Sequence, residues 1–332
     1  MRAIQVLEYG GREQLTASEI AVPEPGVGEV RVQLAYAGVN FMDVYMRNGL
    51  YAKNRAYGTT LPLTLGMEGA GLVDAIGEGV EGLSQGDRVA YCLSAGSYAE
   101  YAVVPAWKLV PVPEDIGLHL AAAMMLQGCT GHYLTHSLFP LEPGQTCLIH
   151  AGAGGVGQVL IQLAKARGAR VLTTVGSPEK AETARCLAAD EVILYKETDF
   201  KEAIHDLTGG QGVHVVYESV GKDTFERSLF CLRHRGTCVL FGFSSGAVTS
   251  VNPQSLAEAG SVFLTRPNLA DYIASNEEVT GRASNLFGMA ASGDLQIEIC
   301  NILDLEDAAL AHAVLEGRAT TGKLLLKTGH DQ

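Results

Sequence analysis

The stretch Thr146–Gly157, TCLIHAGAGGVG, decides the fold of this chain. Its first six residues form an apolar run as long as a buried strand, and Gly152–Gly157 then reads G-x-G-x-x-G. Apolar residues recur at helical spacing behind the glycines until Gly168 ends the pattern. Strand, glycine turn and helix in this order predict a dinucleotide site, with the pyrophosphate facing amides at the helix start. The alternative is a glycine-rich turn that binds nothing.

The three glycines of this motif are expected to have different roles. Gly152 permits the tight turn, Gly154 lets the backbone approach a pyrophosphate, and Gly157 lets the helix pack on the strand.

The composition is that of a globular protein, with 47% hydrophobic and 18% charged residues among 332, enough for two domains. A net charge of -13 argues against a broad nucleic-acid or anionic-membrane footprint. No apolar run is long enough to span a bilayer, and the first residues lack the apolar core of a signal peptide. Seven dispersed cysteines without a C-x-x-C favour reduced thiols. We therefore expect a soluble, cytoplasmic protein.

The first part of the chain, up to about residue 120, is predicted to be rich in short strands separated by glycines, as in a partly closed β-barrel. Residues 38–43 are expected to form a turn and residues 48–57 a loop. The expected strands include Glu29–Ala37, Gly69–Ile76, Arg88–Cys92 and Tyr98–Val104.

Beyond Leu118 the pattern changes to a buried helix, His119–Leu134, followed by alternating strands and helices that end with a strand at Val262–Thr265. This alternation predicts a parallel, doubly wound sheet. A helix over Asp271–Ala291 and a short strand–helix–strand tail, 295–327, are expected to complete the N-terminal domain. The predicted domains are 1–123 with 268–332, and 124–267.

Several motifs, in this order along the chain, resemble one known family. They are VNFMDVYMRNGLY (Val39–Tyr51), LGMEGAG (Leu65–Gly71), GQTCLIHAGAGGVGQVLIQLAK (Gly144–Lys165), YESVG (Tyr217–Gly221), SSGAV (Ser244–Val248), LTRP (Leu264–Pro267) and RATTGK (Arg318–Lys323). The chain resembles the zinc-independent quinone oxidoreductases of the medium-chain dehydrogenase/reductase superfamily, in the zeta-crystallin-like branch. The resemblance implies an α/β protein, with a GroES-like β-barrel-type catalytic domain and a Rossmann doubly wound parallel-sheet domain.

The cofactor is predicted from the end of the second strand of the parallel sheet. Rossmann units that bind NAD usually place an acidic residue there, but this strand ends Thr174–Ser177 without one. Glu179 follows in the expected first helical turn, where acidic residues are common. Lys180 could meet a 2′-phosphate, and Tyr195 could flank the adenine or the same phosphate. Alternatively, they are an ordinary surface lysine and a strand-end aromatic. The residues favour NADPH, and the resemblance strengthens that preference.

No metal site is expected. Zinc enzymes of the superfamily have a cysteine near the position of Asn40 and a histidine at that of Met67, and this chain has neither. Thioether and amide groups do not replace thiolate and imidazole on zinc. His132 and His136 lie four residues apart, but no third ligand accompanies them.

Without zinc, the substrate should be an acceptor that takes hydride readily, such as a quinone or a conjugated carbonyl. Asn40 could bond a substrate oxygen or the nicotinamide ribose, and Asp43 could bind the ribose. Tyr45 and Tyr51 could contact a flat acceptor. Alternatively, Asn40 shapes a turn and the tyrosines are core aromatics of a loop.

The resemblance further implies a set of residues that contact the cofactor. They are Asn40, Phe41, Asp43, Thr130, Gly152, Gly154, Gly155, Val156, Gly157, Gly176, Ser177, Lys180, Tyr195, Ser219, Val220, Phe241, Gly242, Ser244, Leu264, Thr265, Arg266 and Arg318.

Three functions are consistent with these observations: an NADPH-dependent quinone oxidoreductase, an NADPH-dependent enone or alkenal reductase, and a non-enzymatic NADPH-binding crystallin or RNA-binding protein. The negative charge argues against RNA. A homodimer is also expected, because Gly260–Arg266 is suited to pair edge to edge with a second copy.

Overall fold

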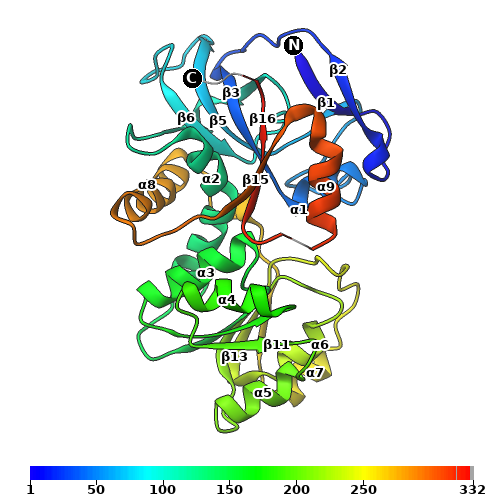
Figure 1. The fold of residues 1–332 in the computed structure, drawn as a ribbon, viewed down its shortest axis with the longest axis vertical. Coiled ribbons are helices and arrows are strands. Elements are labelled where there is room, and N and C mark those ends of the chain that lie inside the picture. Colours follow the sequence, from blue (N-terminus) through cyan, green and yellow to red (C-terminus); the bar gives the residue numbers. More distant parts are fainter. Residues whose placement is uncertain (319, 330–332) are drawn as a thin grey trace. The chain divides into compact units, whose positions relative to one another are not determined.

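The computed structural model describes residues 1–318 and 320–329 and divides into two compact units (Figure 1). Unit 1 comprises Met1–Cys129 and Tyr272–Gln332, and unit 2 comprises Thr130–Asp271. The domain boundaries predicted from the sequence lie a few residues earlier, after 123 and after 267. Residue Ala319 of the RATTGK motif and residues 330–332 lie outside the described residues.

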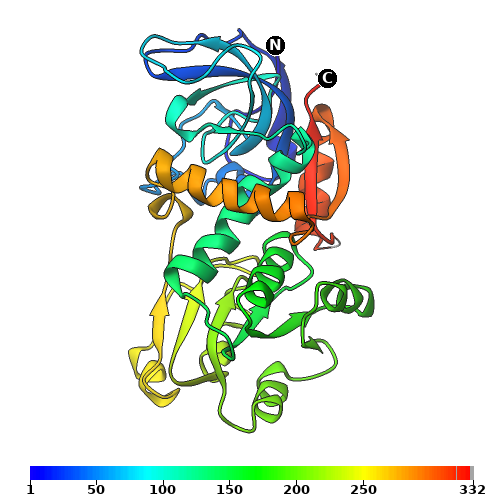
Figure 2. The same ribbon diagram turned by 90° about the vertical axis from the view of Figure 1, so that its left-hand side faces the viewer.

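Unit 2 is built on a parallel sheet of six strands in the order β11-β10-β9-β12-β13-β14. From β9 the chain first adds β10 and β11 on one side of the sheet. It then adds β12, β13 and β14 on the other side of β9. Right-handed crossovers therefore place helices on both faces, as Figures 1 and 2 show. The strands are β9 (Thr146–His150), β10 (Arg170–Val175), β11 (Glu191–Leu194), β12 (Val213–Glu218), β13 (Leu232–Leu240) and β14 (Phe263–Thr265). The helices are α3 (Gly155–Ala166), α4 (Pro178–Cys186), α5 (Phe200–Leu207), α6 (Phe225–Leu229) and α7 (Pro253–Glu258).

The central strands of unit 2 are apolar along their whole length because helices cover both of their faces. One core cluster joins Leu148, Leu172 and Val216 of the sheet to Phe200 and Ile204 of α5. This sheet confirms the doubly wound architecture predicted from the alternation of strands and helices.

Unit 1 contains a three-stranded sheet, β2-β1-β4, and a seven-stranded sheet in the order β15-β16-β3-β5-β6-β8, with β7 paired to β3. Alternate residues of β3, among them Val30, Val32 and Leu34, are fully buried in its core. The strands are β1 (Arg2–Val6), β2 (Leu15–Glu19), β3 (Glu29–Val39), β4 (Leu63–Thr64), β5 (Glu68–Ile76), β6 (Arg88–Cys92), β7 (Tyr101–Pro105), β8 (Val110–Pro111), β15 (Ile299–Asp304) and β16 (Lys323–Lys327). The helices are α1 (Phe41–Arg47), α8 (Asn276–Ser292) and α9 (Ala308–Glu316), and α2 (Leu118–Tyr133) also begins in this unit.

The C-terminal segment returns to the sheet of unit 1, as the sequence predicted. Strand β16 pairs antiparallel with β3, and Leu324 lies opposite Val39. Lys323, the first residue of β16, and Asn40, which directly follows β3, are therefore brought together across 283 residues of chain.

Three elements differ from the sequence-based expectations. Residues 38–43 are not a turn alone, because helix α1 begins at Phe41. Helix α8 begins at Asn276 rather than Asp271, since the Ser275 hydroxyl accepts a hydrogen bond from the Glu278 amide and caps the helix. The strand expected from Tyr98 begins at Tyr101.

No helix in the described ranges is both long enough and apolar enough to cross a membrane.

Candidate functional site

The glycine turn of unit 2 follows β9 directly, and internal packing requires two of its glycines. A Cβ on Gly152 would lie 2.1 Å from the Thr173 hydroxyl, and one on Gly157 would lie 2.2 Å from the Ala151 carbonyl oxygen. No side chain fits at such distances. Ala151 itself has a φ of 56°, which shows how sharply the chain bends here.

Gly154 differs from the other two glycines. It caps the N-terminus of α3, and a Cβ there would meet only the Ala151 carbonyl oxygen, at 3.3 Å. The protein itself therefore leaves room beside Gly154. Gly155 and Val156 follow in the first turn of α3, where helix amides lack intrahelical partners and attract an anion. A pyrophosphate fits the room and the donors of this turn.

The ends of β10 and β11 bring together four residues predicted to bind the cofactor. Ser177 caps α4, and its hydroxyl accepts a hydrogen bond from the Lys180 amide at 3.4 Å. Tyr195 follows β11, and its hydroxyl would lie 2.9 Å from a Cβ on Gly176. Glu179 lies in the first turn of α4, where a hydrogen bond from Ser177 lowers the pKa of its carboxyl. Lys180, in the first turn of α4, is half-buried.

The loops after β12 and β13 are joined to each other by backbone hydrogen bonds. The Phe241 and Gly242 amides donate to the Glu218 carbonyl oxygen at 3.0 and 3.2 Å, and the Ser244 amide donates to that of Ser219 at 3.2 Å. The Ser219 hydroxyl also donates to the His150 carbonyl oxygen at 3.2 Å. The three loops that follow β9, β12 and β13 thus form one connected edge of the sheet.

The remaining residues predicted for the cofactor in unit 2 lie in regular elements or beside them. Leu264 and Thr265 belong to β14, and Thr130 is buried in α2. The Arg266 guanidinium donates to the Phe241 carbonyl oxygen at 3.3 Å and lies over the Phe243 ring.

In unit 1, aromatic rings extend from α1 into the loop that follows it. The ring centroids of Tyr45 and Tyr51 are 5.6 Å apart, and those of Tyr51 and Tyr57 are 5.4 Å apart. At the start of this row of rings, the ring centroid of Phe41 lies 6.2 Å from that of Tyr45. Tyr57 is buried, whereas Tyr45 and Tyr51 are half-buried and keep part of their rings accessible.

Asn40 is the N-cap residue of α1, directly before Phe41, and its side chain belongs to a buried ionic cluster. Its Oδ1 accepts a hydrogen bond from Lys323 Nζ at 2.6 Å, and its Nδ2 donates to Glu68 Oε2 at 2.9 Å. Lys323 Nζ also contacts Glu68 Oε2 at 2.6 Å, and the side chains of these two residues are only 3% and 0% exposed. The charges fix the orientation of the Asn40 amide, because a flipped amide would put its NH2 against the ammonium and its oxygen against the carboxylate.

Asp43 is fully buried next to this cluster. Its Oδ2 accepts hydrogen bonds from the backbone amide of Asn40 at 2.8 Å and from the Tyr98 hydroxyl at 3.2 Å. Its Oδ1 has no hydrogen-bond partner in the described part of the chain. Burial raises the pKa of Asp43 to about 7. Because Asp43 is fully buried, a ribose hydroxyl could not reach this oxygen without movement of the surrounding side chains, so the predicted ribose contact stays a prediction.

A further chain of contacts leads from Asp43 to the surface of unit 1. The Tyr98 hydroxyl lies 3.1 Å from Nε2 of His312, whose Nδ1 lies 3.0 Å from Arg47 Nη1. Arg47 pairs with Glu316 at 2.9 Å. Burial lowers the pKa of His312 to about 3, which keeps this imidazole neutral.

The sequence reasoning missed Lys323, Tyr98 and His312 as neighbours of Asn40 and Asp43. A lysine directly before three leucines, at the start of the strand KLLLK, was the one local signal. Arg318, predicted to bind the cofactor, is exposed and has a φ of 54°.

Comparisons with known proteins agree with this architecture. Residues 26–114 match the model of the alcohol dehydrogenase GroES-like domain, and residues 155–281 match that of the zinc-binding dehydrogenases. Quinone oxidoreductase 1 of Escherichia coli is 43% identical over 97% of this chain and 98% of its own. The crystal structure of E. coli quinone oxidoreductase complexed with NADPH superposes with a TM-score of 0.95, at 42% identity over 98% of this chain and 100% of that one. A 2-haloacrylate reductase of Burkholderia is 39% identical over 98% of each chain. The chain belongs to the quinone oxidoreductase family.

The family belongs to the medium-chain dehydrogenase/reductase superfamily, and the domain model that residues 155–281 match is named for zinc-binding dehydrogenases. The described residues, however, form no such metal site. In residues 1–318 and 320–329, no three His, Cys, Asp or Glu side chains are grouped to hold a metal. Met67 is buried, and the neighbouring Glu68 carboxylate is paired with the Lys323 ammonium. In this member of the family, a cation of the chain itself neutralises Glu68.

Proposed function

We propose that the protein is an NADPH-dependent quinone oxidoreductase, in which unit 2 binds NADPH and unit 1 contacts the quinone. The observation that carries the proposal is the turn at Gly154, where the chain leaves room next to the first amides of α3. Relatives named quinone oxidoreductase and a relative crystallised with NADPH support it.

The cofactor residues proposed in unit 2 are those predicted from the sequence. Gly152, Gly154 and Gly157 shape the phosphate turn, while the Ser219 and Phe241 loops line the same edge of the sheet. NADPH rather than NADH is proposed because β10 is followed directly by Gly176 and Ser177, without a carboxylate for a free ribose hydroxyl.

Lys180 is proposed to meet the 2′-phosphate of NADPH. Lys180→Ala should therefore raise the KM for NADPH and leave the KM for NADH nearly unchanged. Lys201→Ala, on α5 of the same unit, is the matched control and should change neither value. Equal effects of Lys180→Ala on both cofactors would remove this role.

On the acceptor side, Tyr45 and Tyr51 are proposed to provide flat walls for a quinone ring, since their rings are packed edge to face and still partly accessible. The Asn40 amide, which Lys323 and Glu68 hold in one orientation, is proposed to orient a substrate oxygen or the ribose. When bound, NADPH supplies a hydride, and a proton from solvent completes the reduction of quinone to hydroquinone. The side chains then have to orient the acceptor and exclude water.

Tyr51→Ala tests the proposed wall. It should raise the KM for quinone more than it lowers kcat, because it removes contact area and no reacting group. Tyr51→Phe keeps the ring and should leave both values close to wild type. Unchanged quinone kinetics in Tyr51→Ala would refute this assignment.

The decisive experiment is NADPH oxidation measured with a panel of polycyclic and simple quinones beside a panel of enones and 2-haloacrylates. Equimolar hydroquinone formation with quinones only is the expected result. Preferential turnover of the activated alkenes would favour the reductase alternative, which the 2-haloacrylate reductase relative supports. Robust alcohol oxidation with NADP⁺ would contradict both.

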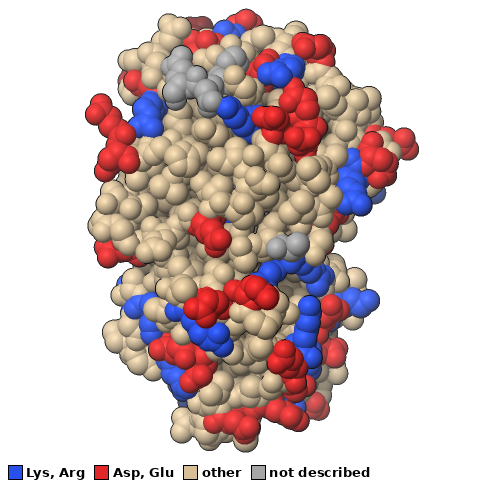
Figure 3. All heavy atoms as spheres, in the orientation of Figure 1, with Lys and Arg blue, Asp and Glu red and all other residues tan. Residues whose placement is uncertain are grey.

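A nucleic-acid role has less support. On the face shown in Figure 3, basic side chains are interspersed with acidic ones and form no continuous basic stripe among the residues drawn in colour.

A homodimer formed through β14 is part of the proposal. This strand lies at the edge of its sheet, and its first residue, Phe263, is 61% exposed. A cytoplasmic location is also proposed, because all seven cysteines are free thiols.

A further inference from the structure

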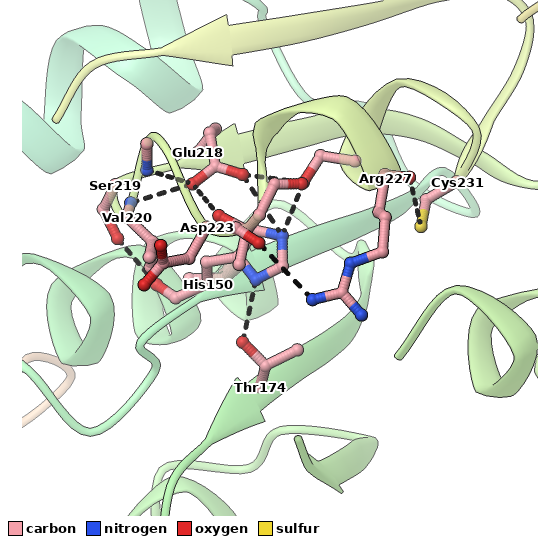
Figure 4. Close-up of polar contacts among 12 residues, drawn as sticks. His150, Thr174, Glu218, Ser219, Val220, Asp223, Arg227 and Cys231 are labelled. Atoms are coloured by element: carbon pink, nitrogen blue, oxygen red, sulfur yellow. Dashed lines mark hydrogen bonds and ion pairs between the residues drawn. The ribbon is translucent and has the colours of Figure 1, made fainter. Parts of the chain in front are cut away.

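A buried polar cluster ties together the carboxyl ends of three neighbouring strands of unit 2 (Figure 4). His150 is the last residue of β9, Thr174 lies near the end of β10, and Glu218 is the last residue of β12. Ser228 of α6 completes the cluster, and none of these four residues is more than 2% exposed.

The hydrogen bonds of the cluster run in one direction. The Ser228 hydroxyl donates to Glu218 Oε2 at 2.6 Å, so its oxygen is left to accept from His150 Nε2 at 2.9 Å. Nδ1 of the same imidazole then accepts from the Thr174 hydroxyl at 2.8 Å. Burial lowers the pKa of His150, which favours this neutral form.

Glu218 holds the loop that follows its own strand. Its Oε1 accepts hydrogen bonds from the Val220 amide at 2.8 Å, the Gly221 amide at 3.0 Å and the Thr224 hydroxyl at 2.8 Å. Among the described residues, no lysine or arginine side chain lies within 4.0 Å of this carboxylate, and the His150 imidazole, 3.5 Å from Oε2, is neutral. A buried carboxylate with so little cationic compensation is stabilised by its N–H and O–H donors, and those donors fix the shape of the loop.

His150 is equally placed to fix the glycine turn. It immediately precedes Ala151, where the chain turns with positive φ into Gly152–Gly157. Its carbonyl oxygen accepts a hydrogen bond from the Ser219 hydroxyl, and its ring reaches Glu218 through Ser228. One set of contacts therefore sets the position of the glycine turn relative to the loop at Ser219 and Val220.

We propose that Glu218 and His150 are positioning residues for NADPH: they hold the glycine turn after β9 and the loop after β12 in the relative position that the cofactor needs. Both residues act through the backbone and neither contacts the cofactor. This inference rests on the proposed function.

The test is the affinity for NADPH, measured by titration of the folded protein, together with separate KM values for NADPH and for quinone. Glu218→Met removes both carboxylate oxygens and with them the acceptors that hold the loop, so the Kd and KM for NADPH should rise about tenfold, with the quinone KM unchanged. Glu218→Gln should recover most of the affinity, because its amide oxygen can still accept from the Val220 and Gly221 amides. A merely structural role would reduce the amount of active protein without this selective change.

Two further variants keep the test decisive. Tyr217→Phe is the matched control, because it removes a buried hydroxyl from the residue of β12 next to Glu218. This hydroxyl donates to the Leu134 carbonyl oxygen, and not to the glycine turn or the loop after β12. It should bind NADPH like wild type. Ser228→Ala removes the hydroxyl that links His150 to Glu218, together with its contact to the Thr224 carbonyl oxygen at 3.0 Å, and should weaken NADPH binding about threefold even if Glu218→Met does not fold. Wild-type affinity in Ser228→Ala and in every folded Glu218 variant would overturn the inference. A wild-type protein that binds no NADPH would instead overturn the proposed function.

Discussion

Replacing Lys323 by methionine should be one of the most destabilising single changes in unit 1. The ammonium lies 2.6 Å from the Glu68 carboxylate, and the two side chains are 3% and 0% exposed. Removal of one partner of a buried pair leaves an uncompensated charge and typically costs about 3–5 kcal/mol. Glu68 keeps the Leu126 amide at 2.5 Å and Asn40 Nδ2 at 2.9 Å as donors. The loss should therefore lie at the lower end, about 3 kcal/mol.

This loss of stability is measured by urea denaturation and by calorimetry. A change of about 3 kcal/mol in a unit of this size lowers the Tm by roughly 6–12 °C. The double variant Lys323→Met with Glu68→Gln carries no buried charge at this point and should regain about 2 kcal/mol relative to Lys323→Met alone. Lys165→Met serves as the control, because the pair of Lys165 with Asp190 is about one-third exposed and should be worth at most about 1 kcal/mol.

Two outcomes would refute this reasoning. Lys323→Met as stable as Lys165→Met would mean that the pair is not buried in solution. A double variant no more stable than Lys323→Met alone would mean that the loss comes from packing and not from the stranded carboxylate.

Three other predictions follow from the structure. The pKa of Asp43 is raised to about 7, so the stability that protonated Asp43 contributes is lost as the pH rises through that value. The pKa of His312 is lowered to about 3, so the stability that neutral His312 contributes is lost as the pH falls below 6.5. Between pH 4 and 6.5 the two slopes oppose each other, each up to about 1.4 kcal/mol per pH unit. Relative to wild type, acidification should therefore destabilise Asp43→Asn and stabilise His312→Gln in urea denaturation; identical pH profiles would contradict this. Gly154→Ala should fold and lose NADPH affinity in a binding titration, whereas Gly157→Ala should lose stability, because its Cβ would lie 2.2 Å from a carbonyl oxygen; equal stability of the two variants would contradict the packing argument. Phe263→Glu should convert the proposed dimer into monomers by sedimentation, and an unchanged sedimentation coefficient would exclude β14 as the interface.

The sequence by itself determined the architecture of unit 2, because the signals involved are local. A strand, a glycine turn and a helix are contiguous in Thr146–Ala166, and the alternation that follows predicts a parallel sheet ending at β14. Short-range patterns of this kind report which residues are buried and where the chain must turn. For the same reason, the absence of a carboxylate directly after β10 could be read from the sequence.

Only the tertiary structure decided which buried polar groups meet. The antiparallel register of β16 on β3 brings Lys323 to Asn40 and Glu68, and the adjacency of β9 and β12 brings His150 to Glu218. Periodicity shows that a residue is buried but does not identify its partner, because any complementary group on another strand could fill that role. A shift of one residue in the β16 register would turn Lys323 to the opposite face of its sheet, so its pairing with Glu68 depends on contacts made along the whole strand.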